Sequence, residues 1–226
     1  MIGEVIIFDM DGTLYDLNDV VQSNYDMQVD FLSSKLNMDK KAAICFLEDH
    51  HVYPVIKKDS MSATELFLQI GLNKKEWSEY RDKRFDVNKI DISKSVDANT
   101  LIKFSEFGVV VLLSSNAYIV LEKVLNHLNI SPLIFNEIIC SDRFPYNVPF
   151  KKKKAMEYLS EKYDVDYSHM YSIGDRYSTD ILPLLELGGK GILIKKTSSI
   201  IHVLSDMEKG LLESSCEYVF YNRIDK

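Results

Sequence analysis

The feature that most constrains the fold of this chain is an alternation of short apolar runs with helical segments after about residue 97. The runs lie at residues 109–113, 138–140, 170–173 and 191–194, and segments with apolar residues at helical spacing separate them. Short strands alternating with helices are typical of a parallel sheet covered on both faces. With a further strand at residues 5–8 and a candidate last strand at 218–220, the sequence predicts an α/β fold with a Rossmann-like, doubly wound parallel sheet.

Residues 16–93 follow a different pattern, which is helical throughout. Val21, Tyr25 and Val29 recur at helical spacing. The stretch Ser62-Ala63-Thr64-Glu65 is a capping box that predicts the start of another helix. We therefore expect an all-helical subdomain, residues 16–93, inserted into a core formed by residues 1–15 and 94–226.

Composition excludes several classes of protein. The formal net charge of -7 argues against a general nucleic-acid binder. No apolar run is long enough to span a bilayer, and no leader pattern is visible, so no membrane association is expected. Cys45, Cys140 and Cys216 match neither a zinc site nor a disulfide framework. The expected location is the cytoplasm, as a monomer or small homo-oligomer.

Two carboxylates follow the first predicted strand. Asp9 and Asp11 lie two residues apart, so in an extended chain both side chains face the same way, about 6.6 Å apart along the strand. Carboxylates so close repel one another unless a cation lies between them or one is protonated. An ordinary turn rich in Asp and Gly is the alternative, and the other strand ends decide between the two.

Polar residues also follow the other predicted strands. Ser114-Ser115-Asn116 follows residues 109–113, Asp175 follows 170–173 with Asp180 five residues later, and a lysine run occupies 151–154. Ligands of doubly wound sheets bind beyond the carboxyl ends of the strands. These residues are therefore predicted to form one site.

The residue types indicate the chemistry of that site. Asp9, Asp11 and Asp175 supply oxygen ligands suited to Mg²⁺. A lysine and a hydroxyl beside them imply a bound anion, and phosphate fits. One carboxylate can then attack phosphorus to form an aspartyl-phosphate, while the other transfers protons.

The motifs "DMDGT", "LLSSN", a later lysine and "GDRYSTD" resemble, in order, the four motifs of the haloacid dehalogenase-like superfamily. The resemblance covers the whole chain, and residues 16–93 look like the helical C1-type cap of that superfamily. It implies a cofactor, Mg²⁺, and a small phosphorylated metabolite as the binding partner.

The resemblance also implies a role for individual residues. It makes Asp9 the nucleophile and Asp11 the general acid/base. The implied catalytic residues are Asp9, Asp11 and Lys152; the phosphate-binding residues are Ser115, Asn116, Thr13, Gly12 and Lys151; the metal-binding residues are Asp9, Asp11, Asp175 and Asp180. Asp11 would contribute its backbone carbonyl, and Asp180 would support the metal site from beside it.

The third motif departs from the pattern of the superfamily. Many capped members have Lys-Pro-Asp-Pro there, whereas this chain has Tyr146-Asn147-Val148-Pro149. The lysine must then come from the run that follows. Counting back from the apolar face of the next helix favours Lys152, with Lys151 second.

The sequence thus predicts a Mg²⁺-dependent phosphatase acting on a small metabolite of the phosphoglycolate, sugar phosphate or nucleotide type. A phosphomutase of the β-phosphoglucomutase kind is the nearest alternative, and a non-catalytic phosphate-binding module is a more distant one. The second acid, Asp11, argues against carbon–halogen cleavage, because haloacid dehalogenases proper lack it. Arg143 either contacts substrate or is merely exposed.

Overall fold

The computed structural model describes residues 3–54, 61–144 and 151–222. The chain forms two compact units, one made of Met1–Leu17 with Ile90–Lys226 and the other of Asn18–Lys89. Each unit has its own hydrophobic core and is described here by itself. The first carries the residues predicted to form the site.

The second unit is helical, as its sequence pattern predicts. Its elements are α1 (Asn18–Leu36), α2 (Lys40–Asp49), α3 (Ala63–Gln69), α4 (Lys74–Arg84) and the short 3₁₀ helix η1 (Val87–Lys89). The predicted cap forms, because the Ser62 hydroxyl accepts the Glu65 N–H at 3.1 Å; the Asn73 side chain caps α4 by accepting the Lys75 N–H at 2.9 Å. An aromatic cluster of Phe31, Phe67 and Trp77 fills its core, with ring centroids 5.1 to 5.3 Å apart.

The first unit is built on one sheet. Within the described residues its strands are β1 (Glu4–Phe8), β2 (Gly108–Leu113), β3 (Glu137–Ile139), β4 (Met170–Gly174), β5 (Lys190–Ile194) and β6 (Tyr218–Tyr221). They pair in the order β3-β2-β1-β4-β5-β6. The order places β1 and β4 side by side at the centre, with Phe8 level with Ile173. Residues following these two strands therefore emerge next to each other.

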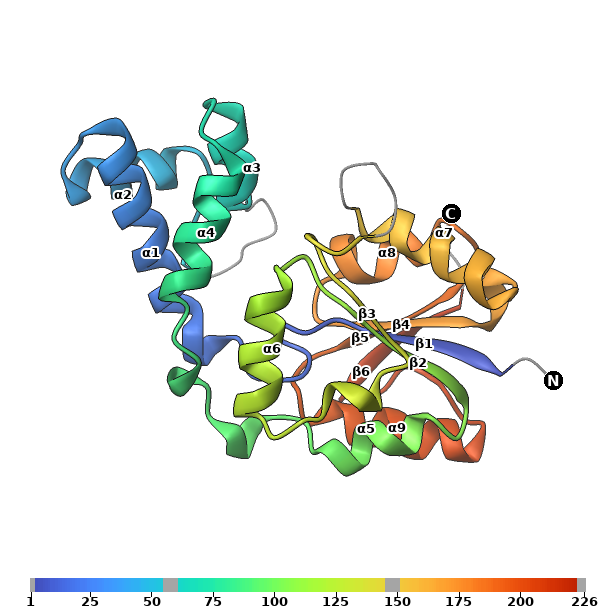
Figure 1. Cartoon of the computed structure of the whole chain (residues 1–226). Coiled ribbons are helices and arrows are strands. Elements are labelled where there is room, and N and C mark those ends of the chain that lie inside the picture. Colours follow the sequence, from blue (N-terminus) through green and yellow to red (C-terminus); the bar gives the residue numbers. More distant parts are fainter. Residues whose placement is uncertain (1–2, 55–60, 145–150, 223–226) are drawn as a thin grey trace. The chain divides into compact units, whose positions relative to one another are not determined.

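Helices cover both faces of this sheet (Figure 1). On one face lie α7 (Lys152–Tyr163) and α8 (Leu182–Leu185), and α5 (Ala98–Phe104) and α9 (Ser199–Lys209) lie on the other. Alternate residues of β1 serve the two faces: Ile7 joins the cluster of Met156 and Leu159, whereas Phe8 packs edge-on against Phe104 at 5.0 Å. The remaining elements are η2 (Ile92–Lys94), α6 (Tyr118–His127), η3 (Pro132–Ile134), η4 (Tyr167–His169) and a π-helical turn, η5 (Tyr177–Ile181).

The α/β, Rossmann-like fold predicted from the sequence is confirmed, with local differences. The sheet is mixed rather than wholly parallel, because β6 runs antiparallel to β5. Helix α7 begins at Lys152, so most of the lysine run lies in its first turn. Between β4 and α8 the chain forms the π-helical turn η5. No helix in the described part of the chain is long and apolar enough to cross a membrane.

Candidate active site

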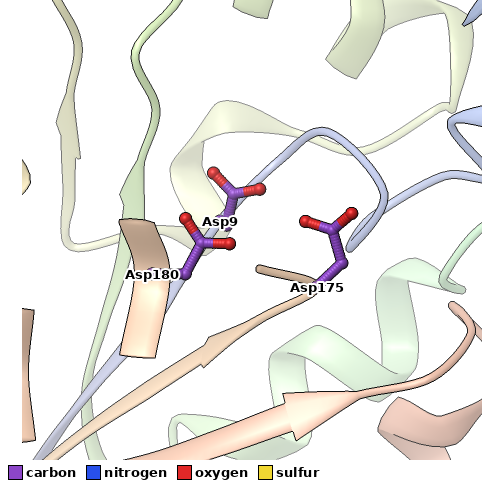
Figure 2. Close-up of side chains that lie close together, drawn as sticks. All are labelled: Asp9, Asp175 and Asp180. Atoms are coloured by element: carbon purple, nitrogen blue, oxygen red, sulfur yellow. The ribbon is translucent and has the colours of Figure 1, made fainter. Parts of the chain in front are cut away.

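Three aspartates meet where β1 and β4 end. Asp9 follows β1, and its N–H bonds to the carbonyl of Ile173 in β4 at 2.9 Å. Asp175 follows β4 directly, and Asp180 lies in η5. One carboxylate oxygen from each of the three lies within 4.8 Å of the others, and Figure 2 shows the three side chains grouped together. The central strands of the sheet therefore bring these acids together.

Lys152, the first residue of α7, supplies the cation of this cluster. Its Nζ donates to Asp9 Oδ1 at 2.5 Å and to Asp180 Oδ1 at 2.7 Å. The side chains of all three residues are at most 11% exposed. Charge-assisted hydrogen bonds of this length in a buried setting fix the lysine tightly. The structure thus brings Lys152 to the carboxylates, whereas Lys151 is exposed at the N-cap of the helix.

The site has more negative charge than its lysine balances. Burial raises the pKa of Asp9, and the nearby Asp180 and Asp11 add to this effect while Lys152 opposes it. Burial also raises the pKa of Asp175 to about 6. Burial lowers the pKa of the Lys152 ammonium, but the Asp9 and Asp180 carboxylates outweigh this and hold it above its ordinary value. Binding a further cation would relieve the repulsion among the acids.

The residues present fit a divalent cation. Asp175 Oδ1 is buried and accepts no hydrogen bond. By contrast, Asp180 is saturated: besides Lys152, its Oδ1 accepts the Thr179 hydroxyl at 2.9 Å and its Oδ2 accepts the Arg176 N–H at 2.9 Å. Buried carboxylate oxygens are normally paired, and a hard cation takes the place of hydrogen-bond donors. Of these two residues, Asp175 therefore keeps an oxygen that could bind a cation, whereas Asp180 is held in place by its hydrogen bonds.

Asp11 is fixed from two sides. The Tyr15 hydroxyl donates to Asp11 Oδ1 at 2.6 Å, and the Asn116 side-chain amide donates to Asp11 Oδ2 at 2.7 Å. Tyr15 lies in the same loop as Asp11, whereas Asn116 follows β2. The second acid of the first motif is thus joined to the residues of the second motif.

The loop after β1 depends on Gly12. Its φ of +77° lies in the left-handed region, which favours glycine. A Cβ added there would come within 2.3 Å of Asp175 Oδ2. Thr13 is fully buried beside it, and the Thr13 and Leu14 N–H groups bond to the Met10 carbonyl at 3.2 and 2.9 Å. The glycine therefore permits both the turn and the close approach of Asp175.

The other predicted residues lie at the same edge without such contacts. Ser115 follows β2 and is exposed, so its hydroxyl is accessible to a ligand. Arg143 is also exposed, and its guanidinium lies over the Tyr118 ring at 3.3 Å. The stretch 146–149, considered above for the third motif, lies outside the described residues.

Sequence reasoning did not find several supporting groups. Tyr15 was not assigned to Asp11, although a tyrosine four residues on in a tight loop is the signal that could have suggested it. The Ser172 hydroxyl of β4 bonds to the Asp180 carbonyl at 2.6 Å and helps to hold η5. A serine in a strand of apolar residues is only a weak signal of such a supporting role, because its role becomes clear only when its hydrogen-bond partner is known.

Comparison with known proteins agrees with this geometry. Residues 4–188 match the family model described as haloacid dehalogenase-like hydrolase. None of the curated proteins compared matches the chain.

Solved structures with a similar fold come from several organisms. A HAD phosphatase from Thermococcus onnurineus is 18% identical, with a TM-score of 0.55 over 85% of this chain and 86% of that one. β-Phosphoglucomutase from Clostridium difficile is 16% identical, with a TM-score of 0.56 over 94% of this chain and all of that one. The Bacillus subtilis protein YfnB, bound to magnesium, is 14% identical, with a TM-score of 0.51 over 91% of this chain and 100% of that one. At these sequence identities, the structural similarity shows the fold alone. The family model spans most of the chain and shows that this chain belongs to the haloacid dehalogenase-like hydrolases.

Proposed function

We propose that this hydrolase is a Mg²⁺-dependent phosphatase that releases phosphate from a small phosphorylated metabolite through an aspartyl-phosphate on Asp9. The observation that carries the proposal is the second acid, Asp11, whose two carboxylate oxygens are held by Tyr15 and Asn116. An alkoxide leaving group needs a proton, whereas a departing halide does not. A second acid that is held in place near the nucleophile therefore favours cleavage of a phosphate ester over carbon–halogen cleavage.

The proposed metal ligands are Asp9, Asp175 and the backbone carbonyl of Asp11. Asp175 Oδ1, which is buried and accepts no hydrogen bond, and the grouping of the acids support this choice. When bound, Mg²⁺ would offset the charge of the phosphoryl group and of the aspartates around it. The magnesium in the structure of YfnB agrees with this proposal.

In the first proposed step, a carboxylate oxygen of Asp9 attacks phosphorus in line with the ester oxygen. The bond from phosphorus to that oxygen breaks, and Asp11, in its protonated form, gives its proton to the departing alcohol. Lys152 holds Asp9 Oδ1 and offsets negative charge during the attack. The products of the step are a free alcohol, Asp9 carrying the phosphoryl group, and an ionised Asp11.

In the second step, Asp11 takes a proton from water as the water oxygen attacks the same phosphorus. The bond from phosphorus to the Asp9 oxygen breaks, which regenerates the Asp9 carboxylate and releases inorganic phosphate. Ser115, exposed at the end of β2, would donate its hydroxyl to a phosphoryl oxygen. The cap role expected for the helical unit stays a prediction.

The experiment that tests this function measures phosphate release from a panel of phosphorylated metabolites, with Mg²⁺ and with a chelator. Asp9→Asn serves as the blank, and Asp49→Asn, at an exposed position in α2, is the matched control. We expect release that needs both Mg²⁺ and Asp9 and that Asp49→Asn leaves unchanged.

Two other outcomes have distinct meanings. If a hexose phosphate is isomerised faster than phosphate is released, the chain is a phosphomutase. If release is equal in the wild type and in Asp9→Asn, the proposed nucleophile is wrong.

A further inference from the structure

The carboxylate of Asp11 lies between two donors from different loops, and this arrangement goes beyond the proposed role of Asp11 itself. We propose that Tyr15 and Asn116 are positioning residues, which hold the Asp11 carboxylate in one orientation for proton transfer to the leaving group. The inference rests on the proposed function, since it concerns the residue that would supply that proton. It assigns to the Tyr15 hydroxyl a part in the reaction that packing alone does not explain.

Packing at position 15 calls for an aromatic ring but not for a hydroxyl. Tyr15 is fully buried, and a phenylalanine ring would fill almost the same space. Burying a hydroxyl without a partner is unfavourable, so a buried tyrosine needs an acceptor. The acceptor here is Asp11 Oδ1, at 2.6 Å, which is within the normal range for a hydroxyl bonded to an oxygen. Burial raises the pKa of the Tyr15 hydroxyl well above its ordinary value, so the hydroxyl stays protonated and remains a donor.

The backbone around Tyr15 holds its hydroxyl in place. The loop folds back so that Asp11 and Tyr15 pair as an isolated β-bridge. The carbonyl of Leu14 accepts the Val96 N–H at 2.9 Å, which joins this loop to the segment before α5. A ring that is fully buried between such fixed points has little freedom to move its hydroxyl away from Asp11.

Asn116, on the other side of the Asp11 carboxylate, is also held by hydrogen bonds. Its N–H bonds to the Ser114 hydroxyl at 3.2 Å, and its carbonyl accepts the Ser141 N–H at 3.1 Å. Its side-chain amide, itself buried, reaches Asp11 Oδ2. With one oxygen bonded to each loop, the carboxylate plane cannot turn freely about its last side-chain bond.

A misplaced acid affects some substrates more than others. An alkoxide leaving group depends strongly on a proton, whereas 4-nitrophenolate leaves readily without one. Loss of a positioning residue should therefore reduce turnover of an alkyl phosphate and spare that of 4-nitrophenyl phosphate. A residue needed only for folding would affect both substrates equally.

The test compares Tyr15→Phe with Tyr218→Phe. Tyr218 is also fully buried, and its hydroxyl donates to an aspartate, Asp206, at 2.7 Å, but it lies in β6 and outside the site. With glycerol phosphate, we expect Tyr15→Phe to lower kcat roughly tenfold or more, with little change in KM. With 4-nitrophenyl phosphate, we expect a change of about twofold or less, since this leaving group needs little protonation. Tyr218→Phe should leave the ratio of the two rates at its wild-type value.

A double-mutant cycle with Asp11→Asn shows whether Tyr15 acts through Asp11. In the Asp11→Asn background, Tyr15→Phe should have no further effect on the alkyl phosphate, because the group that it positions is already gone. If the two effects multiply instead, the inference is wrong. Asn116→Ala carries the same expectation and replaces Tyr15→Phe if that variant does not fold.

The outcomes separate this inference from the proposed function. A wild type without Asp9-dependent phosphate release from either ester contradicts the function, and the inference with it. A wild type that is active, with the same ratio of rates in Tyr15→Phe and Asn116→Ala, contradicts only the inference.

Discussion

The ammonium of Lys152 lies 2.7 Å from Asp180 Oδ1, and this contact turns the lysine toward Asp9. Asp180 is 2% exposed and accepts hydrogen bonds on both oxygens, so its carboxylate is fixed and holds the lysine in position. The arrangement explains how one member of a run of four lysines differs from the rest. Lys153 and Lys154 pair instead with Glu186 and Glu157 on the surface.

The lysine contacts predict that Lys152→Ala strongly lowers kcat whereas Lys151→Ala does not. Removing one preorganised charge from such a site costs on the order of 100-fold in kcat. It also leaves two buried carboxylates without their counter-ion, which should lower the free energy of unfolding by roughly 3–5 kcal/mol. Lys151 is exposed, so its variant should stay close to wild type in both respects. Steady-state kinetics and urea unfolding measure the two effects, and equal losses in the two variants would exclude this role for Lys152.

The proposed metal site predicts that Mg²⁺ stabilises the folded protein. A ligand that binds only the folded state adds about 2.7 kcal/mol at 100 times its Kd. Asp175→Asn should remove most of this gain, because it removes the charge of a proposed ligand whose Oδ1 accepts no hydrogen bond in the folded protein. The measurement is the Tm with Mg²⁺ and with EDTA, with KCl at equal ionic strength as the control. A Tm of Asp175→Asn that rises with Mg²⁺ as much as the wild type's would place the metal elsewhere.

The fold was largely predictable because its signals are local. Short apolar strands alternating with helices define the parallel sheet, and its central strands then place Asp9 and Asp175 side by side. The antiparallel direction of β6 has no such signal, since a last strand at the edge can run either way.

The candidate site was predictable in its residues more than in its contacts. Asp9, Asp11 and Asp175 stand out in the sequence because they follow predicted strands closely, at the edge where ligands of such sheets bind, and Asp180 lies five residues after Asp175. The bonds from Tyr15 and Asn116 to Asp11 span 4 and 105 residues, and the longer one exists only in the folded chain. That Asp180 pairs with Lys152 likewise depends on where η5 and α7 meet, which spacing in the sequence does not reveal.

The three cysteines should react at different rates. Cys140 is fully buried, and burial together with the nearby Asp142 carboxylate raises the pKa of its thiol to about 12. Because the thiolate is the reactive form, Cys140 should resist alkylation at pH 8, whereas Cys45 and Cys216 are exposed and should react. Intact-mass spectrometry after iodoacetamide should show two additions to the native protein and three in urea. A third addition to the native protein at the rate of the first two would contradict the burial of Cys140.

Gly12 and Gly71 form a matched pair that separates backbone strain from damage to the site. Gly12 has a φ of +77° and Gly71 a φ of +79°. Replacing either by alanine should therefore lower the free energy of unfolding by roughly 1–2 kcal/mol. The space around them differs: a Cβ at Gly71 meets nothing within 4 Å, whereas one at Gly12 would lie 2.3 Å from Asp175 Oδ2. Gly12→Ala must therefore displace Asp175 and should remove both the stabilisation by Mg²⁺ and the turnover. Gly71→Ala should lose a similar amount of stability, measured by urea unfolding, and keep both. If Gly12→Ala keeps its response to Mg²⁺, Asp175 does not need its present position to bind the metal.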